Sequence, residues 1–514
     1  MTDQSRADRR AARRQKRVET PLLRVPFRPM RNPMPPMEVI SPEQLEQLHT
    51  ASMRILEEIG LSLLDAETLS ILEKAGARVD HASQHAWLDR GLVLEAVARA
   101  PHTFTWRARN PAHDVPIGGD TIALAPQGGV AYVQSIDRGR RRGTLDDYEN
   151  FLKINQMVGV LHFAGEQLIA PYEVPSSLRH LRRLPRALTL TDKAVMEAAH
   201  GREITADAVA MARLAFGAEP ADGSPTIGGV INASSPLRYD ERMLGGLITF
   251  ARAGQATIIT PFILAGAMSP ITIAAALAQQ NAEALAGIAL TQLVRPGAPV
   301  IYGGFTTNVD MRSGSPAFGT PEGAWALAVG AQLARRYGLP YRGSGSLTNS
   351  KAPDAQAATE TAWTIWPAVL SHTNFIMHAV GWLEGGLTVS YEKIMLDLES
   401  LAMFQHFLAG FEISDETLAL DMMAEVGPGG HHFGTAHTQA RFSTEFYQPM
   451  LADRQGYENW VAAGSPDAAQ RASALWKDVL AAYEAPPVDP ALREALDDFV
   501  ARREREIGDR SLYD

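Results

Sequence analysis

The sequence predicts an α/β protein, a (β/α)8 TIM-type barrel preceded by an N-terminal helical and β appendage. Short apolar runs rich in β-branched residues alternate with helical stretches along most of the chain. This alternation implies parallel βαβ units, and a series of seven or eight units favours a closed barrel. A doubly wound open sheet is the main alternative. No GxGxxG segment follows the first strand, so dinucleotide binding has little support.

Predicted strands and helices follow one another between residues 163 and 426. The strands are expected at residues 163–169, 187–196, 226–232, 257–263, 299–303, 340–343 and 374–380, with an eighth near 424–426. The helices are expected at residues 175–183, 205–216, 240–253, 271–293, 321–337, 355–370 and 391–408.

Helix-start signals precede the predicted barrel. Ser41 is expected to cap a helix that has Pro42 in its first turn and Gln44 three residues past the cap, and Gly60 is expected to end it. Shorter helices and then short strands follow before residue 145. The predicted parts are a basic, proline-rich arm (1–40), an appendage (41–145), the barrel (146–483) and a helical tail (484–514).

Composition and charge exclude several classes of protein. The chain has 514 residues, of which 46% are hydrophobic, and a formal net charge of -10. That charge argues against a nucleic-acid groove, which needs a basic face. The sequence contains no cysteine, which excludes disulfides, thiolate nucleophiles and zinc sites that use sulfur.

The basic N-terminus does not predict secretion. No apolar segment follows its arginines, and a proline-rich stretch comes instead at residues 21–36. The longest uncharged run, 256–278, is divided by Pro261, Gly266 and Pro270, so no membrane span is expected. We therefore expect a cytoplasmic protein with a basic arm that is disordered or lies on its surface. An organelle transit peptide or a nucleic-acid tail is the alternative for that arm.

The loops after the predicted strands contain the candidate binding residues, because a barrel of this kind has its chemistry at the carboxyl ends of its strands. These loops are rich in glycine and small polar residues, and they also contain Phe262, Tyr302, Phe305, Trp382 and Phe433. A quaternary ammonium has no N–H to donate, so proteins hold it through ring faces and carboxylates. Packing between barrel and helices is the alternative for each ring.

Neither a metal nor an activated nucleophile is expected. The histidines at His431, His432 and His437, or at His372 and His378, lack the spacing of a metal motif. No GxSxG segment is present. Hydrogen bonding to a ligand carboxylate, or a structural role, is favoured for these histidines.

Four stretches of the chain resemble the trimethylamine methyltransferase family. They are residues 41–60 (SPEQLEQLHTASMRILEEIG), 345–360 (GSLTNSKAPDAQAATE), 381–397 (GWLEGGLTVSYEKIMLD) and 427–454 (GPGGHHFGTAHTQARFSTEFYQPMLADR). The resemblance covers residues 41–483. It implies a barrel enzyme that binds no cofactor directly. The enzyme would move a methyl group from a methylated amine to the cobalt of a cobalamin carried by a separate corrinoid protein.

The resemblance also bears on the substrate. Some members of this family carry pyrrolysine near the sixth strand, whereas the corresponding segment here, placed at 344–348, contains only standard residues. Similar members without pyrrolysine act on quaternary amines, so glycine betaine is the expected substrate. A quaternary ammonium that loses a methyl group leaves as a neutral tertiary amine. No general base is therefore required, and no catalytic side chain is assigned.

The resulting hypothesis places the substrate cation in a box of aromatic rings at the open end of the barrel. The expected contacts are the rings of Phe262, Tyr302, Phe305 and Trp382, the polar groups of Gln167, Asn232, Ser346 and Thr348, and His378 or His431 at the substrate carboxylate. A homo-oligomer is possible. Two other functions stay open: an intracellular quaternary-amine binding or sensing protein, and a barrel lyase with a Schiff base on Lys351.

Overall fold

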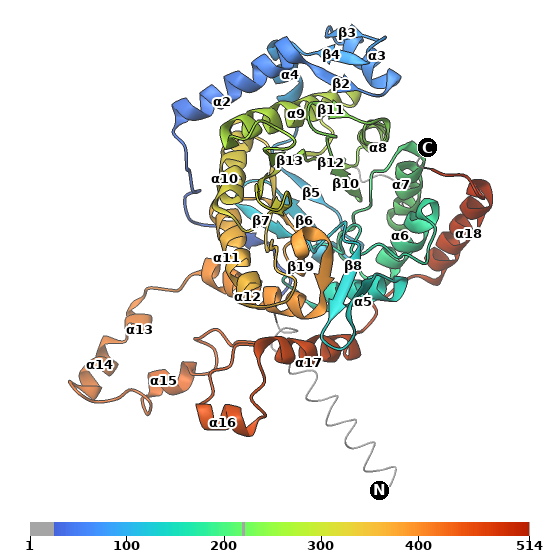
Figure 1. Cartoon of the computed structure of the whole chain (residues 1–514). Coiled ribbons are helices and arrows are strands. Elements are labelled where there is room, and N and C mark those ends of the chain that lie inside the picture. The colour runs from blue at the N-terminus through green and yellow to red at the C-terminus, as the bar shows by residue number, and fades with distance from the viewer. Residues whose placement is uncertain (1–24, 218–221, 513–514) are drawn as a thin grey trace.

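The computed structural model describes residues 25–217 and 222–512, and its centre is a sheet of parallel strands surrounded by helices (Figure 1). The order across the sheet is β7 (Thr121–Leu124), β18 (Phe375–Met377), β17 (Tyr341–Ser344), β14 (Val300–Gly303), β12 (Ala256–Ile259) and β10 (Gly228–Ile231). A short N-terminal strand, β1 (Met30–Arg31), pairs antiparallel with β7. The basic residues predicted near the N-terminus, within 1–24, lie outside the described residues.

Backbone hydrogen bonds extend the sheet beyond β7 and beyond β10. They run from His162 N to Leu124 O (2.9 Å), from Ala164 N to Ala194 O (2.8 Å) and from Glu197 N to Gly228 O (3.1 Å). Two short extended segments, around residues 163 and 195, therefore lie along these two edges.

Eight helices pack outside the strands. They are α5 (Leu145–Met157), α6 (Arg179–Leu190), α7 (Arg202–Phe216), α8 (Glu241–Arg252), α9 (Ile273–Val294), α10 (Pro321–Arg336), α11 (Ala355–Leu370) and α12 (Tyr391–Ala409). The side chains of Thr320, Asp354 and Ser390 each accept a hydrogen bond from the first turn of the following helix, which satisfies a backbone donor that the helix leaves unpaired. The helices predicted from periodicity after residue 200 are confirmed to within a few residues.

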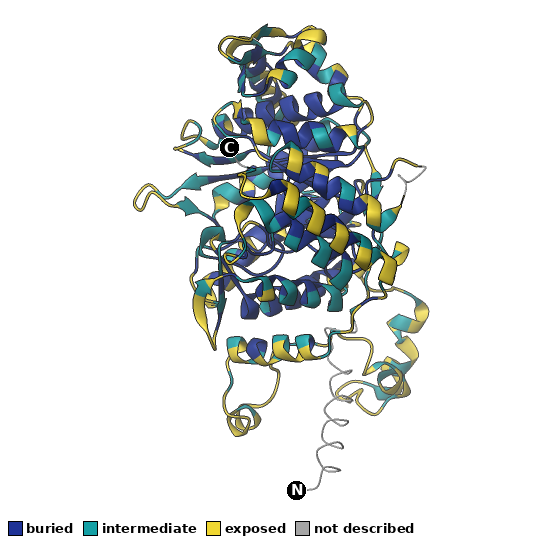
Figure 2. Ribbon diagram, turned by 90° about the vertical axis from the view of Figure 1, so that its right-hand side faces the viewer, coloured by how far each residue is buried: buried dark blue, intermediate teal, exposed yellow. Residues whose placement is uncertain are grey.

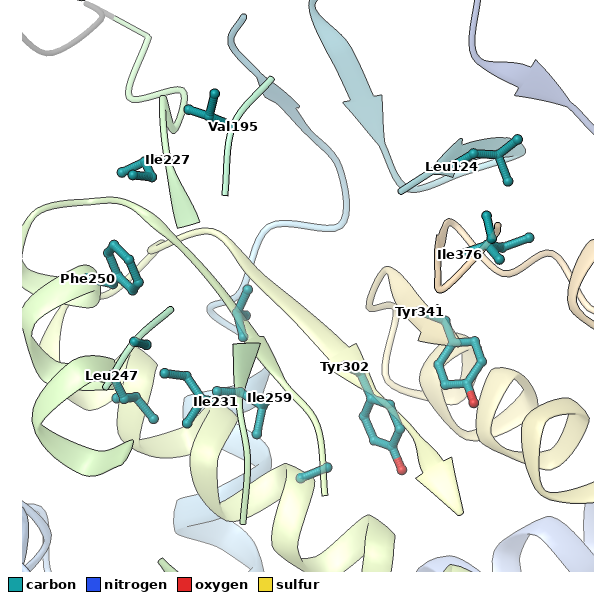
Figure 3. Packing of buried hydrophobic residues seen from close by; sticks show 14 of the residues in the cluster. Leu124, Val195, Ile227, Ile231, Leu247, Phe250, Ile259, Tyr302, Tyr341 and Ile376 are labelled. Atoms are coloured by element: carbon teal, nitrogen blue, oxygen red, sulfur yellow. The ribbon is translucent and has the colours of Figure 1, made fainter. Parts of the chain in front are cut away.

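The core lies between these helices and the sheet (Figure 3). Leu124, Ile231, Ile259 and Ile376 from the strands, together with Phe250 from α8, are completely buried. Strands covered on both faces become almost continuously apolar, which explains why their sequences do not alternate between polar and apolar residues.

Three strand predictions were wrong in whole or in part. The predicted strand at 163–169 pairs only at Phe163, and residues 166–169 form bends. In the predicted strand at 187–196, α6 continues to Leu190, and the chain pairs only at Ala194. Leu181, Leu184 and Leu188 are buried at helical spacing in α6, and this periodicity outweighs the apolar character of the segment. The predicted eighth strand near 424–426 lies in the helix α14 (Leu420–Val426). On the side away from β17, β18 pairs with β7 and not with a strand near 424–426. β7 comes from the segment that was predicted to be an appendage.

The N-terminal appendage covers α9. Its helix α2 (Pro42–Arg54) begins with the predicted capping box at Ser41. The other elements are η2 (Ile55–Ile59), β2 (Leu61–Leu63), α3 (Ala66–Lys74), β3 (Arg78–Asp80), β4 (His85–Trp87) and α4 (Arg90–Val97). Because α2 and α4 pack on α9, α9 is buried on nearly all sides, in agreement with its apolar sequence.

Small sheets and turns fill the loops between the main elements. They comprise β5 (Phe104–Trp106), η3 (Pro111–His113), β6 (Val115–Ile117), β8 (Tyr132–Ser135), β9 (Gly139–Arg142), η4 (Ser176–Leu178), β11 (Arg238–Tyr239), β13 (Phe262–Ala265), β15 (Phe305–Val309), β16 (Pro316–Ala317), β19 (Trp382–Leu383), η5 (Glu384–Gly386) and β20 (Thr388–Ser390). Of these, β13 follows β12 and β15 follows β14, and the two pair in parallel. They extend the central sheet at its carboxyl end.

Beyond α12 the chain leaves the body and returns to it. The outer part contains α13 (Asp415–Leu418), α14, α15 (Ala436–Arg441) and α16 (Tyr457–Ala462), and it is mostly exposed (Figure 2). The returning helices are α17 (Ala468–Ala481), which packs on α12, and α18 (Pro490–Ile507), which packs on α6 and α7. None of the helices in the described part of the chain is long and apolar enough to cross a membrane.

Candidate functional site

Five rings meet at the carboxyl ends of the parallel strands and form what we call the aromatic cluster: Phe262, Phe305, Phe318, His378 and Trp382. The centroid of Phe305 lies 5.1 Å from that of Phe262, 5.6 Å from Phe318 and 5.4 Å from His378. Trp382 meets Phe318 edge to face at 5.6 Å and lies 4.4 Å from His378. The rings come from β13, β15, the loop before α10, the residue after β18, and β19.

The local backbone positions His378 and Trp382. His378 adopts a φ of 57° directly after β18, and its Nδ1 lies 3.1 Å from the Oγ of Ser344 at the end of β17. Burial, followed by the charge of Arg342, holds the pKa of His378 well below its usual value, so the imidazole is neutral at physiological pH. The backbone of Gly386, at a φ of 92°, lies against the Trp382 indole, where a β-carbon would come within 2.3 Å of the ring.

A buried arginine lies beside the cluster. Arg342 in β17 is 2% exposed, and its Cζ lies 5.2 Å from the ring centroid of Phe305. Its Nη1 donates to the carbonyl of Gly304 at 3.3 Å, whereas its buried Nε has no acceptor. Within residues 25–217 and 222–512 no carboxylate forms an ion pair with it. Burial lowers the pKa of Arg342 to about 10, so the group is still charged at neutral pH and lacks a neutralising partner.

A second set of charged groups is buried next to this arginine. Arg183 on α6 forms an ion pair with Glu197 and donates to Gln167 Oε1 at 3.1 Å. Burial, and then the negative charge of Glu197, raise the pKa of Glu166 to about 7. The Glu166 carboxyl therefore exchanges a proton near neutral pH, and Arg342 is close enough to affect its pKa.

A small cavity lies between α10 and two rings of the cluster, Phe305 and Phe318. It has a volume of about 30 Å³ and also lies against Ser344 and Leu347. A single water needs about 10–15 Å³ on this measure, so the cavity is too small for a quaternary amine unless side chains move. Trp382 does not line this cavity, and its buried Nε1 has no hydrogen-bond acceptor.

The structure brings some of the predicted site residues together. Phe262, Phe305, His378 and Trp382 belong to the aromatic cluster, and the hydroxyls of two others lie close by but are bonded to protein groups. Ser346 Oγ donates to Ala379 O at 2.6 Å, and Thr348 Oγ1 donates to Glu360 at 2.5 Å. Gln167 lies with Arg183, as described above.

Three predicted residues lie elsewhere. Tyr302 faces the helical layer: its hydroxyl donates to Asn281 on α9 at 3.0 Å, and its ring stacks on Tyr337. Asn232 is exposed in the loop that follows β10. His431 lies in the exposed segment between α14 and α15, because the strand predicted to precede it is a helix outside the sheet.

Sequence reasoning missed Phe318, Leu347 and Arg342. Phe318 and Leu347 pack with Phe262, Phe305 and Trp382 in one apolar cluster, but neither directly follows a strand predicted from the sequence. Arg342 lies within a predicted strand, and the only signal for it was a charged residue in a segment expected to be buried.

The alternative chemistries find little support in the geometry. Lys351 is exposed and donates to the carbonyl of Asn349 at 2.8 Å, whereas a Schiff-base lysine is normally held in a buried site. Among the residues that the structure describes, no group of three His, Cys, Asp or Glu side chains is arranged to hold a metal ion.

Comparison with known proteins identifies the family. The family model for trimethylamine methyltransferase matches residues 3–508. The chain belongs to this family. It is therefore a methyltransferase, and the family predicted from the sequence is confirmed.

Two curated relatives and one solved structure illustrate the similarity. The glycine betaine methyltransferase of Desulfitobacterium hafniense is 39% identical over 477 residues, covering 93% of this chain and 99% of the relative. A trimethylamine methyltransferase from the same species is 32% identical over 474 residues, covering 91% and 94%. The crystal structure of the Methanosarcina barkeri monomethylamine methyltransferase matches 95% of this chain and 92% of that chain with a TM-score of 0.50, at 9% identity. That likeness concerns the fold alone.

Proposed function

We propose that this methyltransferase acts on glycine betaine, and that its methyl acceptor is the cobalt of a corrinoid held by a separate protein. The observation that carries the proposal is the position of Arg342 beside the aromatic cluster. A buried cation without a carboxylate partner lies 5.2 Å from the ring of Phe305. Glycine betaine has a carboxylate for the arginine and a trimethylammonium group for the rings. The 39% identity with a glycine betaine methyltransferase supports the same substrate.

The reaction requires no proton transfer. One N–CH3 bond breaks, its electron pair stays on nitrogen, and the product leaves as a neutral tertiary amine. The corrinoid supplies the electron pair that forms the new bond to the methyl carbon. The task of this chain is then to hold the N–CH3 bond in line with the acceptor and to exclude water. The neutral His378 is compatible with this task, since no general base is needed.

Aromatic rings suit a cation whose charge disappears during the reaction. A group that binds the charged substrate too tightly raises the barrier, because its interaction is lost in the transition state. Each ring contributes only about 0.5–2 kcal/mol to cation binding. Phe305 and Trp382 therefore hold the ammonium with modest interactions, while Arg342 anchors the carboxylate, which keeps its charge throughout.

The roles proposed from sequence are revised accordingly. Phe262, Phe305, Trp382 and His378 are retained as substrate-binding residues, and Arg342 takes the carboxylate role proposed for His431. The cavity of about 30 Å³ beside α10 is too small for a quaternary amine and is not lined by Phe262, His378 or Trp382, so it is not the proposed binding site.

We also propose that the central sheet closes into the (β/α)8 barrel expected from sequence. The segments around residues 163 and 195 bond to each other and to the edges at β7 and β10. With the six parallel strands they make eight, the number in a barrel of this type. The division of the chain into arm, appendage, barrel and tail is likewise a proposal, with β7 reassigned to the barrel.

Spectroscopy of the methyl acceptor tests the function. Purified protein, a reduced corrinoid protein and glycine betaine should together give the visible spectrum of methylcobalamin, whereas trimethylamine in place of glycine betaine should give much slower change. Methyl transfer from trimethylamine but not from glycine betaine would refute the substrate. Tight binding of glycine betaine without any transfer to corrinoid proteins would favour a sensing protein instead.

A further inference from the structure

An arm of the chain, residues 410–446, leaves the body after α12 and contains α13, α14 and α15 (Figure 1). These helices have 4, 7 and 6 residues, and none of them contains a buried residue. Helices this short are not stable in water alone, and in proteins their stability comes from packing of an apolar face. The described part of this chain does not cover the arm, so another surface must do so.

The arm presents a large apolar surface. Its exposed apolar side chains, with exposed fractions between 45% and 85%, are Phe411, Ile413, Leu418, Leu420, Met423, Phe433, Phe442 and Phe446. A segment that exposes this many large apolar side chains is typical of an interaction site. Eight side chains of this size would bury on the order of 1,000 Å² on one partner, and a stable protein–protein interface needs about 800 Å² from each partner.

A complementary groove lies on the body of the same chain. It has a volume of about 480 Å³, runs along α11, and is lined by Met37, Trp363, Trp366 and Leu370, among others. Trp363 is 52% exposed and Trp366 is 42% exposed. Exposed tryptophan and methionine side chains are typical of the centre of an interface.

We propose that the arm of one copy of this chain packs into the α11 groove of a second copy, while the arm of the second copy packs into the groove of the first. A two-fold dimer requires both halves of each contact on a single chain, and this chain provides an uncovered apolar arm and an open apolar groove. In Figure 1 the arm projects sideways from the ring of helices, which is the direction expected for contact with the side of a neighbouring copy. The inference does not depend on the proposed substrate.

Light scattering coupled to size exclusion, with the full chain over a concentration series, tests the proposal. The wild type should have a mass of twice 55.8 kDa or a larger even multiple. Phe442→Glu on the arm and Trp363→Lys in the groove should each weaken association about tenfold or more. Ile271→Glu is the matched control, because Ile271 is 63% exposed but lies before α9, outside both surfaces. The altered side chains are exposed, so each variant should keep the thermal transition of the wild-type monomer.

Mixing the two variants distinguishes arm-to-groove contact from arm-to-arm contact. When Phe442→Glu is mixed with Trp363→Lys, a mixed dimer has one unaltered contact and one contact in which the introduced charges are opposite, so the mixture should associate more strongly than either variant alone. A monomeric wild type would overturn the proposal. So would an oligomer whose dissociation constant is the same in Phe442→Glu as in the wild type, or a mixture no stronger than its components.

Discussion

Replacement of Arg342 by methionine separates the binding role of this arginine from any role in folding. A hydrogen bond between a charged donor and a carboxylate contributes about 1.5–3 kcal/mol, which is about 10- to 150-fold in affinity at 25 °C. Arg342→Met should therefore weaken glycine betaine binding by that factor. Tetramethylammonium has no carboxylate, so its affinity for the aromatic cluster should not fall, and loss of the nearby positive charge of Arg342 should raise it.

Stability should change in the opposite direction. Burial lowers the pKa of Arg342 from 12.5 to about 10, and such a shift corresponds to about 3 kcal/mol against the charged form in the folded state. Because the folded pKa of this base is depressed, the penalty applies at every pH below about 10 and includes neutral pH. Methionine fills similar space without a charge, so the free energy of unfolding should stay equal or rise.

Isothermal titration with both ligands, together with thermal unfolding, measures these effects. Arg335→Met is the matched control: Arg335 is a partly buried arginine on α10 that donates to Ser371 O, and its pKa is also lowered by burial. It should leave both affinities unchanged. Unchanged glycine betaine affinity in Arg342→Met would refute the carboxylate role. Equal losses for the two ligands would show that the substitution deforms the cluster instead.

Three further predictions follow from the site. Trp382→Leu should weaken binding of glycine betaine and of tetramethylammonium equally, by about 0.5–2 kcal/mol in titration calorimetry. Burial raises the pKa of Glu166 from 4.5 in the unfolded chain to about 7 in the folded protein. The folding stability that corresponds to this shift, about 3 kcal/mol, is fully present below pH 4.5 and is lost as the pH rises through 7. Denaturant unfolding should therefore show a smaller fall in stability between pH 5 and pH 8 in Glu166→Gln than in the wild type. Asp397 pairs with Lys393 and accepts from Gly381 N at 2.7 Å, so Asp397→Ala should cost about 3–5 kcal/mol of unfolding free energy and reduce methyl transfer through movement of Trp382.

Each of these predictions has a control and a contradicting result. Trp325→Leu changes an exposed tryptophan on α10 and should not affect binding; a larger loss there than in Trp382→Leu would count against the cluster. Identical pH dependence in wild type and Glu166→Gln would show that Glu166 does not titrate near 7. Glu58→Ala breaks an exposed pair with Arg54 and should be neutral, so equal effects of Glu58→Ala and Asp397→Ala would refute the importance of burial.

Local sequence predicted most of the helices and, of the four rings of the expected aromatic box, the three that lie in the cluster: Phe262, Phe305 and Trp382. Ser41 with Pro42 and Gln44 specified the start of α2, because a capping box is complete within four residues. Phe305 and Trp382 were found because aromatic residues directly after predicted strands reach the carboxyl end of a parallel sheet wherever the strands pair. The family could also be predicted, since it depends on ordered runs of residues and not on contacts.

Only the tertiary structure decided which distant segments meet. β7 belongs beside β18 because residues 121–124 pair with residues about 250 positions away, and no local pattern encodes that choice. Arg342 is a candidate ligand for a carboxylate because no acidic residue of the described chain forms an ion pair with it, although Glu166 is close enough to affect its pKa; this is a property of its surroundings in space. The same holds for the arm: a helical sequence at 420–426 is local information, but the absence of any covering surface emerges only once the chain is folded.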